Sequence, residues 1–253
     1  MSPMALTLVT GGTRGIGAAI SRRLAEEGHD LVLAYRADDR AAKETAESVR
    51  ALGVECVTVR ADLTADLETG AGVEKLFAAA AEVGRLTGVV NNAGATYLYA
   101  PLAETPVDVV RRTIDVNLTA AVLVARAAVL AMSRSYAGHG GVLVNVSSGA
   151  ATIGSPGEYV HYAAAKAGVD ALTHGLGLEV AGDGIRVVGV APGLVDTDLH
   201  ARTGDPGRLD RMAPAVPLGR AGTPAEIADA VAWLMSDAAS YVTATTLRVA
   251  GGR

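Results

Sequence analysis

The chain has 253 residues, of which 50% are hydrophobic and 19% charged, and its formal net charge is −5. About 250 residues often form a single α/β domain with one large core. The negative charge argues against non-specific nucleic-acid binding, and the single cysteine, Cys56, excludes an intramolecular disulfide framework and a multi-cysteine zinc site.

Short β-branched runs alternate with longer helical stretches along the chain. We predict strands at Ala5–Thr10, Asp30–Tyr35, Val54–Val59, Gly88–Asn91, Gly141–Ser147, Ile185–Ala191 and Thr246–Val249. We predict helices at Gly15–Gly28, Asp38–Leu52, Leu67–Val83, Pro106–Tyr136, Tyr159–Ala181 and Pro224–Ser236. This alternation predicts βαβ units and a parallel sheet. Since the composition does not break anywhere, we expect one domain over residues 1–253, a doubly wound α/β fold of about seven strands with helices on both faces.

Two residue types depart from average usage, and two segments bear on where the protein acts. Glycine occurs 30 times, where average usage of about 7% gives roughly 18, and lysine stands only at Lys43, Lys75 and Lys166. The longest apolar stretch, 120–132, contains Arg126 and falls short of the roughly 20 residues that span a bilayer. Because the first ten residues lack the basic region of a secretory signal, we expect a cytoplasmic protein without a membrane segment.

A glycine-rich turn, residues 10–17, follows the first predicted strand and opens the first predicted helix. Glycines at such a turn let the backbone approach a pyrophosphate, whose charge is stabilised by the helix N-terminus. The spacing of Gly11, Gly15 and Gly17 differs from the common G-x-G-x-x-G pattern. The position between a strand and a helix is therefore what favours a dinucleotide site over a purely structural turn.

Tyr162 and Lys166 are four residues apart on a predicted helix, so their side chains share one face. A free tyrosine has a pKa of about 10 and is a poor acid–base group near neutral pH. A nearby ammonium stabilises the phenolate and lowers that pKa, as acid–base catalysis requires. A chain that uses arginine almost everywhere keeps a lysine here, where a compact cation differs from a planar guanidinium. We therefore predict an acid–base pair, with an ordinary surface pair as the alternative.

Residues 192–222 do not fit the alternation of strands and helices. The stretch carries four prolines and five glycines and is too long for an ordinary connection. It follows the sixth predicted strand, and ligands of open α/β sheets bind beyond the carboxyl ends of the strands. We expect a loop that covers the substrate, with a disordered segment as the alternative.

Five motifs, spread over essentially the whole chain, resemble those of the classical short-chain dehydrogenase/reductase family. Besides the glycine-rich turn they are Asp62-Leu63, Asn91-Asn92-Ala93-Gly94, Tyr162-Ala163-Ala164-Ala165-Lys166, and Pro192-Gly193 followed by Thr197. The resemblance implies a Rossmann-type fold and hydride transfer between a nicotinamide cofactor and a carbonyl or carbinol carbon. The C-terminal stretch also resembles the family's ending, but it departs at Ala244 and Ala250, in a region that often helps to build the family's tetramer.

The resemblance also implies a catalytic role for four residues. Tyr162 gives or takes the proton of the substrate oxygen, and Ser148 hydrogen-bonds that oxygen. Lys166 lowers the pKa of the tyrosine and contacts the nicotinamide ribose, while Asn117 holds a water that relays protons to the lysine. Ser147 is the alternative to Ser148. Only one of the two can contact the substrate oxygen, because neighbouring side chains on a strand point to opposite faces.

The cofactor-binding residues that the resemblance implies lie in these motifs and at the end of the second strand. They are Gly11, Thr13, Arg14, Gly15, Ile16, Gly17, Tyr35, Arg36, Asp62, Leu63, Asn91, Ala93, Gly94, Tyr162, Lys166, Pro192, Gly193, Val195 and Thr197. Arg14 and Arg36 indicate NADP(H), because arginine accommodates the 2′-phosphate where an acidic residue would bind the ribose hydroxyl. Asp38 and Asp39 are the competing candidates for the ribose, and we interpret them as the N-cap and first-turn charge of the next helix. The five histidines show no metal-ligand spacing, and we expect no metal.

We therefore interpret the chain as an NADP(H)-dependent ketone reductase, similar to the 3-oxoacyl-[acyl-carrier-protein] reductases, with a small-molecule substrate that a carrier protein can hold. The alternatives are a sugar or polyol dehydrogenase, similar to glucose dehydrogenase, and a non-catalytic NADP(H)-binding regulatory protein. The fourth and fifth predicted helices each have an apolar face, and in the family such helices pair across a dimer interface. We expect a homotetramer or homodimer that binds neither nucleic acid nor membrane.

Overall fold

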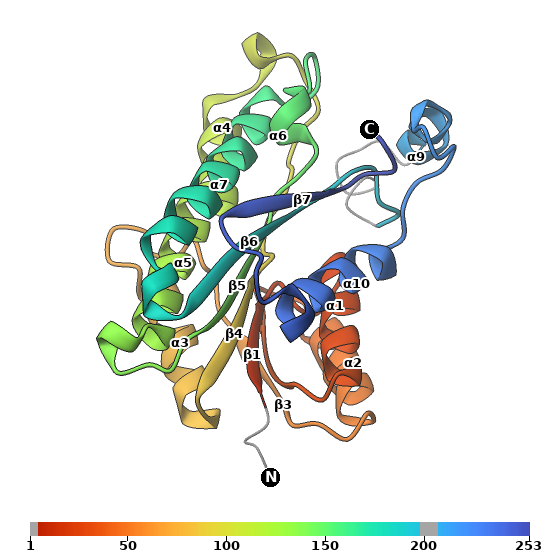
Figure 1. Cartoon of the computed structure of the whole chain (residues 1–253). Coiled ribbons are helices and arrows are strands. Elements are labelled where there is room, and N and C mark those ends of the chain that lie inside the picture. The colour runs from red at the N-terminus through yellow and green to blue at the C-terminus, as the bar shows by residue number, and fades with distance from the viewer. Residues whose placement is uncertain (1–4, 198–206) are drawn as a thin grey trace.

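The strands form one parallel sheet in the order β3-β2-β1-β4-β5-β6-β7 (Figure 1). The computed structural model describes residues 5–197 and 207–253. Its strands are β1 (Leu6–Thr10), β2 (Asp30–Tyr35), β3 (Cys56–Arg60), β4 (Leu86–Asn91), β5 (Gly141–Val146), β6 (Ile185–Pro192) and β7 (Thr245–Val249). The predicted doubly wound α/β fold of seven strands is confirmed.

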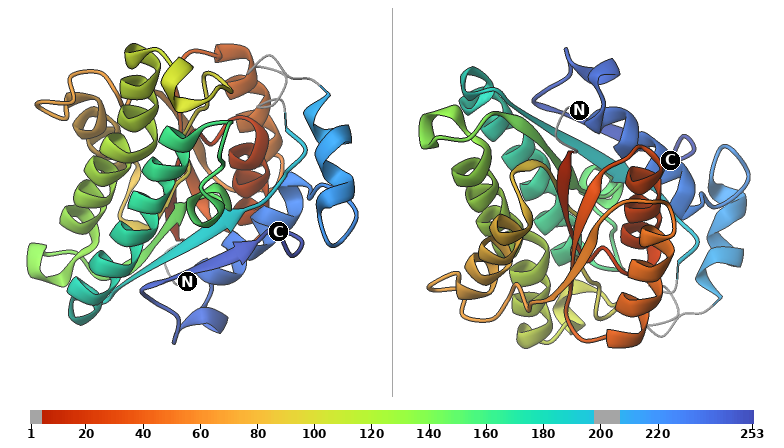
Figure 2. Two further views of the ribbon diagram at one scale, coloured as in Figure 1. Left: turned by 90° about the horizontal axis from the view of Figure 1, so that it is seen from above. Right: turned by 90° about the horizontal axis from the view of Figure 1, so that it is seen from below.

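Helices cover both faces of this sheet, as Figures 1 and 2 show. One face carries α1 (Gly15–Glu26), α2 (Asp39–Arg50) and α10 (Pro224–Met235), and the other carries α3 (Ala71–Val83), α5 (Ala120–Met132) and α7 (Val160–Glu179). Three shorter helices, α4 (Val107–Ile114), α6 (Ala150–Ile153) and α9 (Arg208–Met212), complete the α-helices of the described residues.

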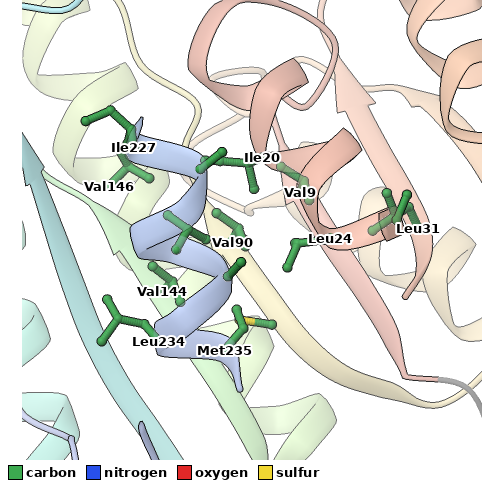
Figure 3. Packing of buried hydrophobic residues seen from close by; sticks show 14 of the residues in the cluster. Val9, Ile20, Leu24, Leu31, Val90, Val144, Val146, Ile227, Leu234 and Met235 are labelled. Atoms are coloured by element: carbon green, nitrogen blue, oxygen red, sulfur yellow. The ribbon is translucent and has the colours of Figure 1, made fainter. Parts of the chain in front are cut away.

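Alternating strand residues divide the core into two clusters. Val9 of β1 packs with Ile20 of α1 and Ile227 of α10, as Figure 3 shows. Its neighbour Leu8 points to the other face and joins the cluster under α3 and α5. Both strand residues are fully buried, and burying a side chain of this size contributes about 1.5–3 kcal/mol. Burial on both faces explains why these strands read as nearly continuous apolar runs.

The order of the strands fixes where a ligand can bind. β1 pairs with β2 on one side and with β4 on the other, so the chain changes direction across the sheet between β1 and β4. In open parallel sheets, this point at the carboxyl ends of the strands is where ligands bind. The glycine-rich turn follows β1 at this edge, and the predicted motifs after β4, β5 and β6 lie along it (Figure 1).

The helix predicted over 106–136 is shorter in the structure and is not α-helical throughout. α4 and α5 are joined by a π-helical turn, Asp115–Thr119, and together they form one helical run from Val107 to Met132. Within the described residues, this is the one helical run that is long and apolar enough, by length and composition alone, to cross a membrane, a test that core helices of soluble proteins also pass. Its α5 part packs Ala120, Val124 and Ala128 into the core under the sheet.

The start of one predicted helix needs correction. The helix predicted from Leu67 begins at Ala71, because Asp66 and Gly70 have φ values of +51° and +75° and the chain forms a turn before the helix.

The described part of residues 192–222, predicted to be a covering loop, contains α9, a short 3-10 helix and a bridge between Val195 and Gly222. Residues 198–206 of the predicted covering loop lie outside the described residues.

Candidate active site

The turn after β1 is built so that only glycine fits at two of its positions. Gly11 has a φ of +62°, in the left-handed region that glycine adopts at no steric cost. A Cβ on Gly17, in the first turn of α1, would lie 2.1 Å from the carbonyl oxygen of Gly11. Gly15 begins the helix. The predicted glycines therefore bring the backbone of the turn into direct contact with the start of α1.

The N-terminus of α1 presents its backbone amides without a side-chain cap. Arg14 is the N-cap residue, with an extended backbone, and its side chain makes no capping hydrogen bond. Thr13 is buried and its carbonyl oxygen accepts a hydrogen bond from Thr45 Oγ1 at 3.0 Å, while Ile16 packs against the cluster under α1. Uncapped amides at a helix N-terminus stabilise a phosphate. This cradle fits the pyrophosphate of a dinucleotide, and a side chain at Gly17 would obstruct it.

Thr10 and Asn92, which the predicted cofactor set omits, hold the turn against the loop after β4. Asn92 Nδ2 donates to the carbonyl oxygens of Thr10 and Gly11 at 2.9 and 3.2 Å. Thr10 Oγ1 accepts hydrogen bonds from the backbone N–H groups of Asn92 and Ala93, both at 2.9 Å. Their places inside two motifs were the sequence signal for this contact, and the structure supplies the pairing.

Asn91 lies at the same edge, but its side chain makes hydrogen bonds inside the protein. Its Nδ2 donates to the carbonyl oxygen of Ala121 at 2.9 Å and to Asn145 Oδ1 at 3.1 Å, and the residue is 5% exposed. Any contact of Asn91 with a cofactor therefore falls to its backbone. Asn145, whose Nδ2 donates to Thr173 Oγ1 at 3.0 Å, is a buried partner that no motif indicated.

The residues at the carboxyl ends of β2 and β3 form a charged cluster that lies largely in solvent. Tyr35 Oη donates to Asp39 Oδ1 at 2.8 Å, and this hydrogen bond raises the pKa of Tyr35. Arg36 is exposed, and its carbonyl oxygen accepts a hydrogen bond from Arg60 Nε at 3.3 Å. Strand pairing sets Arg60 opposite Tyr35. Arg60 thus adds a cation beside Arg36, one of the residues predicted to bind the 2′-phosphate. Only the pairing of the strands reveals this neighbour.

Asp38 links this cluster to the glycine-rich turn. Its Oδ1 accepts a hydrogen bond from the backbone N–H of Ala41 at 3.0 Å, so it is the N-cap of α2 as predicted. Its Oδ2 lies 3.4 Å from Arg14 Nη1, in an ion pair whose side chains are 38% and 43% exposed. Exposed pairs of this kind contribute about 0–1 kcal/mol. Arg14 is therefore weakly held and free to turn toward a phosphate.

Asp62 and Leu63 follow β3 at the same edge. Asp62 is exposed, and its Oδ1 accepts hydrogen bonds from the backbone N–H and the hydroxyl of Thr64 at 2.9 and 2.7 Å. Leu63 is buried in the cluster under α3. The pair therefore forms a fixed turn whose polar residue faces solvent beyond β3.

Asn117 is brought to the site by the π-helical turn. It is 1% exposed; its Oδ1 accepts a hydrogen bond from Ala95 N at 3.2 Å, and its Nδ2 donates to the carbonyl oxygens of Ala95 and Thr113 at 2.7 and 2.8 Å. A Cβ on Gly94 would lie 2.7 Å from Asn117 Oδ1 and 3.5 Å from Lys166 Nζ. The absence of a side chain at Gly94 lets the asparagine and the lysine approach this loop together. π-helical turns occur frequently at functional sites.

Lys166 is a buried cation on α7. The residue is 4% exposed, its Nζ donates to the carbonyl oxygen of Val146 at 2.8 Å, and it lies 5.9 Å from the centroid of the Tyr162 ring. Burial lowers the pKa of Lys166 to about 8. Ser147 Oγ donates to the carbonyl oxygen of Lys166 at 3.2 Å, which fixes this part of α7 on the end of β5.

Ser148 lies close enough to the Tyr162 hydroxyl to affect the pKa of that phenol. Ser147 turns away into the protein, where it is 3% exposed, so Ser148 is the serine that the structure brings near the tyrosine. Burial raises the pKa of Tyr162 above its usual value, and the nearby Ser148 hydroxyl lowers it in part. The predicted lowering by Lys166 is not found in the chain alone, because Lys166 Nζ is held at Val146 and the ring is removed from water.

The segment after β6 closes the site on its far side. The N–H of Gly193 donates to the carbonyl oxygen of Val249 at 3.0 Å, and a Cβ on Gly193 would lie 2.7 Å from the Cα of Ala250. Pro192 ends β6, and Val195 is buried. A Cβ on Gly15 would lie 3.7 Å from Thr197 Cγ2. Thr197 is thus brought against the glycine-rich turn, although the two are far apart in the sequence.

These residues form one continuous edge with two kinds of chemistry. One end holds a phenol, a hydroxyl, a buried amine and an amide, and the other holds a helix N-terminus and exposed guanidinium groups. The first set can exchange a proton with a substrate oxygen, and the second can bind phosphates. Within residues 5–197 and 207–253, no group of three or more His, Cys, Asp or Glu side chains is placed to hold a metal ion.

Sequence comparisons connect this arrangement to oxidoreductases. A family model described as enoyl-(acyl carrier protein) reductase matches residues 11–253. The uncharacterized oxidoreductase YgfF of Escherichia coli K12 is 41% identical, over 99% of this chain and 100% of the relative. L-rhamnose 1-dehydrogenase (NAD(P)(+)) of a Sphingomonas species is 38% identical, over 97% and 94% of the two chains. The 3-oxoacyl-[acyl-carrier-protein] reductase FabG of Staphylococcus aureus is 35% identical, over 97% and 96%.

Solved structures of similar proteins superpose on nearly the whole chain. A short-chain type dehydrogenase/reductase from Mycobacterium marinum superposes with a TM-score of 0.89 at 30% identity, covering 98% of this chain and 94% of that one. A blue fluorescent protein from a metagenomic library, solved in complex with NADPH, has a TM-score of 0.86 at 33% identity, covering 98% and 97%.

Proposed function

The chain belongs to the short-chain dehydrogenase/reductase family, whose members bind a nicotinamide cofactor, and from this membership we propose that it is an NADP(H)-dependent reductase that converts a ketone to a secondary alcohol. The observation that carries the proposal is the convergence of Tyr162, Ser148 and Lys166 beside Gly94 and Asn117, at the sheet edge where the glycine-rich turn lies. A nicotinamide cofactor, when bound, supplies the hydride, and the protein positions it and handles the proton.

The proposed proton donor is Tyr162. Reduction of a carbonyl needs a protonated donor at the substrate oxygen, and the Tyr162 phenol is in that form near neutral pH, since its pKa in the chain alone lies above the usual value. Ser148, beside the same phenol, can donate its own hydrogen to the substrate oxygen and orient it. The two hydroxyl groups would thus meet one oxygen atom from neighbouring directions, as carbonyl polarisation requires.

The proposed role of Lys166 and Asn117 is to return a proton to Tyr162 after it has protonated the substrate oxygen. Because burial lowers the pKa of Lys166 to about 8, its amine can gain and lose a proton near neutral pH, which suits a group that restores the proton of the phenol. Asn117 Oδ1 and Lys166 Nζ both border Gly94. We propose that Asn117 holds the relaying water there and that Lys166 also contacts the nicotinamide ribose.

The proposed preference for NADP(H) rests on the exposed end of the site. Arg14 and Arg36 stand where a 2′-phosphate is expected, and Arg60 adds a guanidinium at the end of the adjacent strand. A related structure holds NADPH, which supports the choice. The test is the Kd of NADPH against that of NADH, and tighter binding of NADH would overturn it.

The proposed substrate class is a 3-oxoacyl thioester or a similar ketone, on the similarity to the FabG reductase. A sugar or polyol dehydrogenase is the second candidate, because an L-rhamnose dehydrogenase is 38% identical to the chain, against 35% for the FabG reductase. The experiment is NADPH oxidation with a panel of ketones and 3-oxoacyl thioesters, with sugars and NADP+ as the reverse reaction. A chain that binds NADPH but turns over no substrate in either direction would instead support the non-catalytic regulatory protein.

We further propose that the chain acts in the cytoplasm as a homodimer or homotetramer on a small molecule, free or held by a carrier protein. Val107, Val122 and Leu130 on the α4–α5 run are 74%, 41% and 41% exposed, an apolar surface that a second copy would cover. Light scattering measures the mass in solution, and a monomer at high concentration would contradict this part of the proposal.

A further inference from the structure

Arg208, the first residue of α9, forms the most buried ion pair among the described residues. Its two Nη atoms donate to Glu158 Oε1 and Oε2 at 2.8 and 2.6 Å, and the two side chains are 5% and 31% exposed. Its guanidinium carbon lies 4.6 Å from the ring centroid of Tyr99 and 5.7 Å from that of Tyr159. The fork geometry and the stacking on rings are both specific to arginine.

The charge of this pair is retained in the buried position. Burial lowers the pKa of Arg208, but the hydrogen bond to Glu158, the charge of Glu158 and the nearby Tyr159 and Tyr99 together outweigh it, and the pKa rises on balance. Its Nε is buried without a hydrogen-bond partner, an arrangement that costs free energy and calls for a physical reason. The two tyrosine rings pack on the guanidinium, and their attraction for the cation offsets part of this cost.

Glu158 and Tyr159 belong to a conformationally unusual segment that directly precedes α7. Gly154, Ser155 and Gly157 all have positive φ values, +70°, +45° and +75°. A left-handed conformation at a residue such as Ser155 is sterically unfavourable and persists only where its surroundings hold it. The carbonyl oxygen of Ser155 accepts hydrogen bonds from the N–H groups of Glu158 and Tyr159, both at 3.3 Å. Glu158 is held in turn by the Arg208 pair and by a hydrogen bond from the N–H of Ala100 to its carbonyl oxygen at 2.7 Å.

Three packed aromatic rings, those of Tyr99, Tyr159 and Tyr162, connect this segment to the candidate active site. The Tyr99 and Tyr159 centroids are 5.1 Å apart, and the Tyr159 ring meets the Tyr162 ring edge-on with centroids 5.2 Å apart. The N–H of Tyr162 also donates to the carbonyl oxygen of Tyr159 at 3.0 Å. Arg208 thus supports Tyr159, and Tyr159 supports both the ring and the backbone of Tyr162.

We propose that Arg208 is a positioning residue, which acts with Glu158 to fix Tyr99 and Tyr159 as an aromatic wall that holds Tyr162 in place beside the substrate. The inference deepens the proposed function, on which it rests for the role of Tyr162. Since Glu158 occupies both Nη atoms of Arg208, the wall offers ring surface and a neutralised charge. It therefore suits the uncharged, carbon-rich part of a ketone next to its carbonyl group.

The test compares Arg208→Lys with Arg23→Lys. Arg23, on α1, also makes ion pairs, with Glu27 at 2.6 Å and with Asp229 at 2.9 Å, but these side chains are more exposed, 32%, 49% and 66%. Lysine keeps the charge at Arg208 and loses the planar fork. We expect kcat for a ketone with NADPH to fall between about tenfold and a hundredfold, as displaced catalytic groups do, with the Kd of NADPH unchanged. Arg23→Lys should change neither quantity.

A second readout does not depend on turnover. In protein labelled with isotope on tyrosine, the NMR resonance of Tyr162 is identified by its absence in Tyr162→Phe. Arg208→Lys should shift the resonances of Tyr162 and Tyr159, and Glu158→Gln should shift them less. The double variant should be no worse than Arg208→Lys alone, because the two side chains act as one unit.

Three outcomes would overturn the inference. They are unchanged tyrosine resonances in Arg208→Lys, a loss of kcat that only follows the folded fraction, and an equal loss in Arg23→Lys. If the wild-type chain reduces no ketone, the proposed function fails, and the tyrosine resonances still decide whether Arg208 positions Tyr162.

Discussion

The two ends of the site hold their charged groups in opposite ways. Lys166 is 4% exposed, with its Nζ 2.8 Å from the carbonyl oxygen of Val146, and burial moves its pKa to about 8. Arg14, at the other end, is 43% exposed and lies 3.4 Å from Asp38. Water and salt screen an exposed pair and scarcely reach a buried group. The buried end is therefore fixed for a chemical step, and the exposed end can adjust to a ligand.

The largest expected effect is that of Tyr162→Phe at the buried end. The ring keeps its packing on Tyr159, but the proton donor is lost, and loss of a general acid costs about 10²–10⁴ in rate. Turnover should become negligible, while the Kd of NADPH, measured by fluorescence titration, should change little. Tyr136→Phe, at a tyrosine that is 60% exposed, is the control. Retained turnover in Tyr162→Phe would remove the tyrosine from the chemistry.

Lys166→Met tests the buried end through stability. With an ordinary pKa of 10.5 and a folded value of about 8, the unfolded chain binds more protons than the folded one between these two values. Unfolding free energy should therefore rise with pH through this window, while below about 8 the burial penalty is present in full. Denaturant titrations across the window should show a smaller rise in Lys166→Met. Lys75→Met, at an exposed lysine, should keep the wild-type rise, and an unchanged rise in both variants would contradict the burial of charge.

Arg36→Ala tests the exposed end through recognition. A hydrogen bond to a charged group contributes about 1.5–3 kcal/mol, so the Kd of NADPH should rise by about tenfold to a hundredfold, with the Kd of NADH unchanged. Arg40→Ala, at a neighbouring arginine that is 85% exposed, should leave both constants alone. Equal weakening of NADPH and NADH would mean that Arg36 does not recognise the 2′-phosphate.

The smallest effect is expected for Asp38→Asn, because it removes a charge from a screened pair. Asparagine caps a helix as well as aspartate does, so α2 should keep its N-cap and stability should change by less than about 1 kcal/mol. Release of Arg14 should tighten NADPH binding by up to about fivefold. Asp38→Ala, which also loses the cap at Ala41, separates the two roles by its lower unfolding free energy. Weaker NADPH binding in Asp38→Asn would show that the pair preorganises Arg14.

Much of the fold followed from local patterns. Alternation of apolar runs and helical stretches predicted the strands of the sheet and their parallel pairing, since burial on both faces needs such runs. The glycine-rich turn was predicted from its place between a strand and a helix, and the structure supplies the steric reason, since a Cβ at Gly17 would collide with the turn. The start of α3 was missed, because the positive φ values of Asp66 and Gly70 arise from a turn that helical periodicity does not record.

What the sequence determined by itself was the fold class, the position of the glycine-rich turn and the pairing of Tyr162 with Lys166 on one helix face, all of which depend on neighbours within a few residues. Tertiary structure alone decided that Arg60 joins Arg36 and that Arg208 reaches Glu158. These contacts join segments distant in the chain, and burial and strand pairing act on whichever side chains the fold brings together. Side-chain chemistry can be read locally, but the water around it, which sets pKa and the strength of an ion pair, is set by packing.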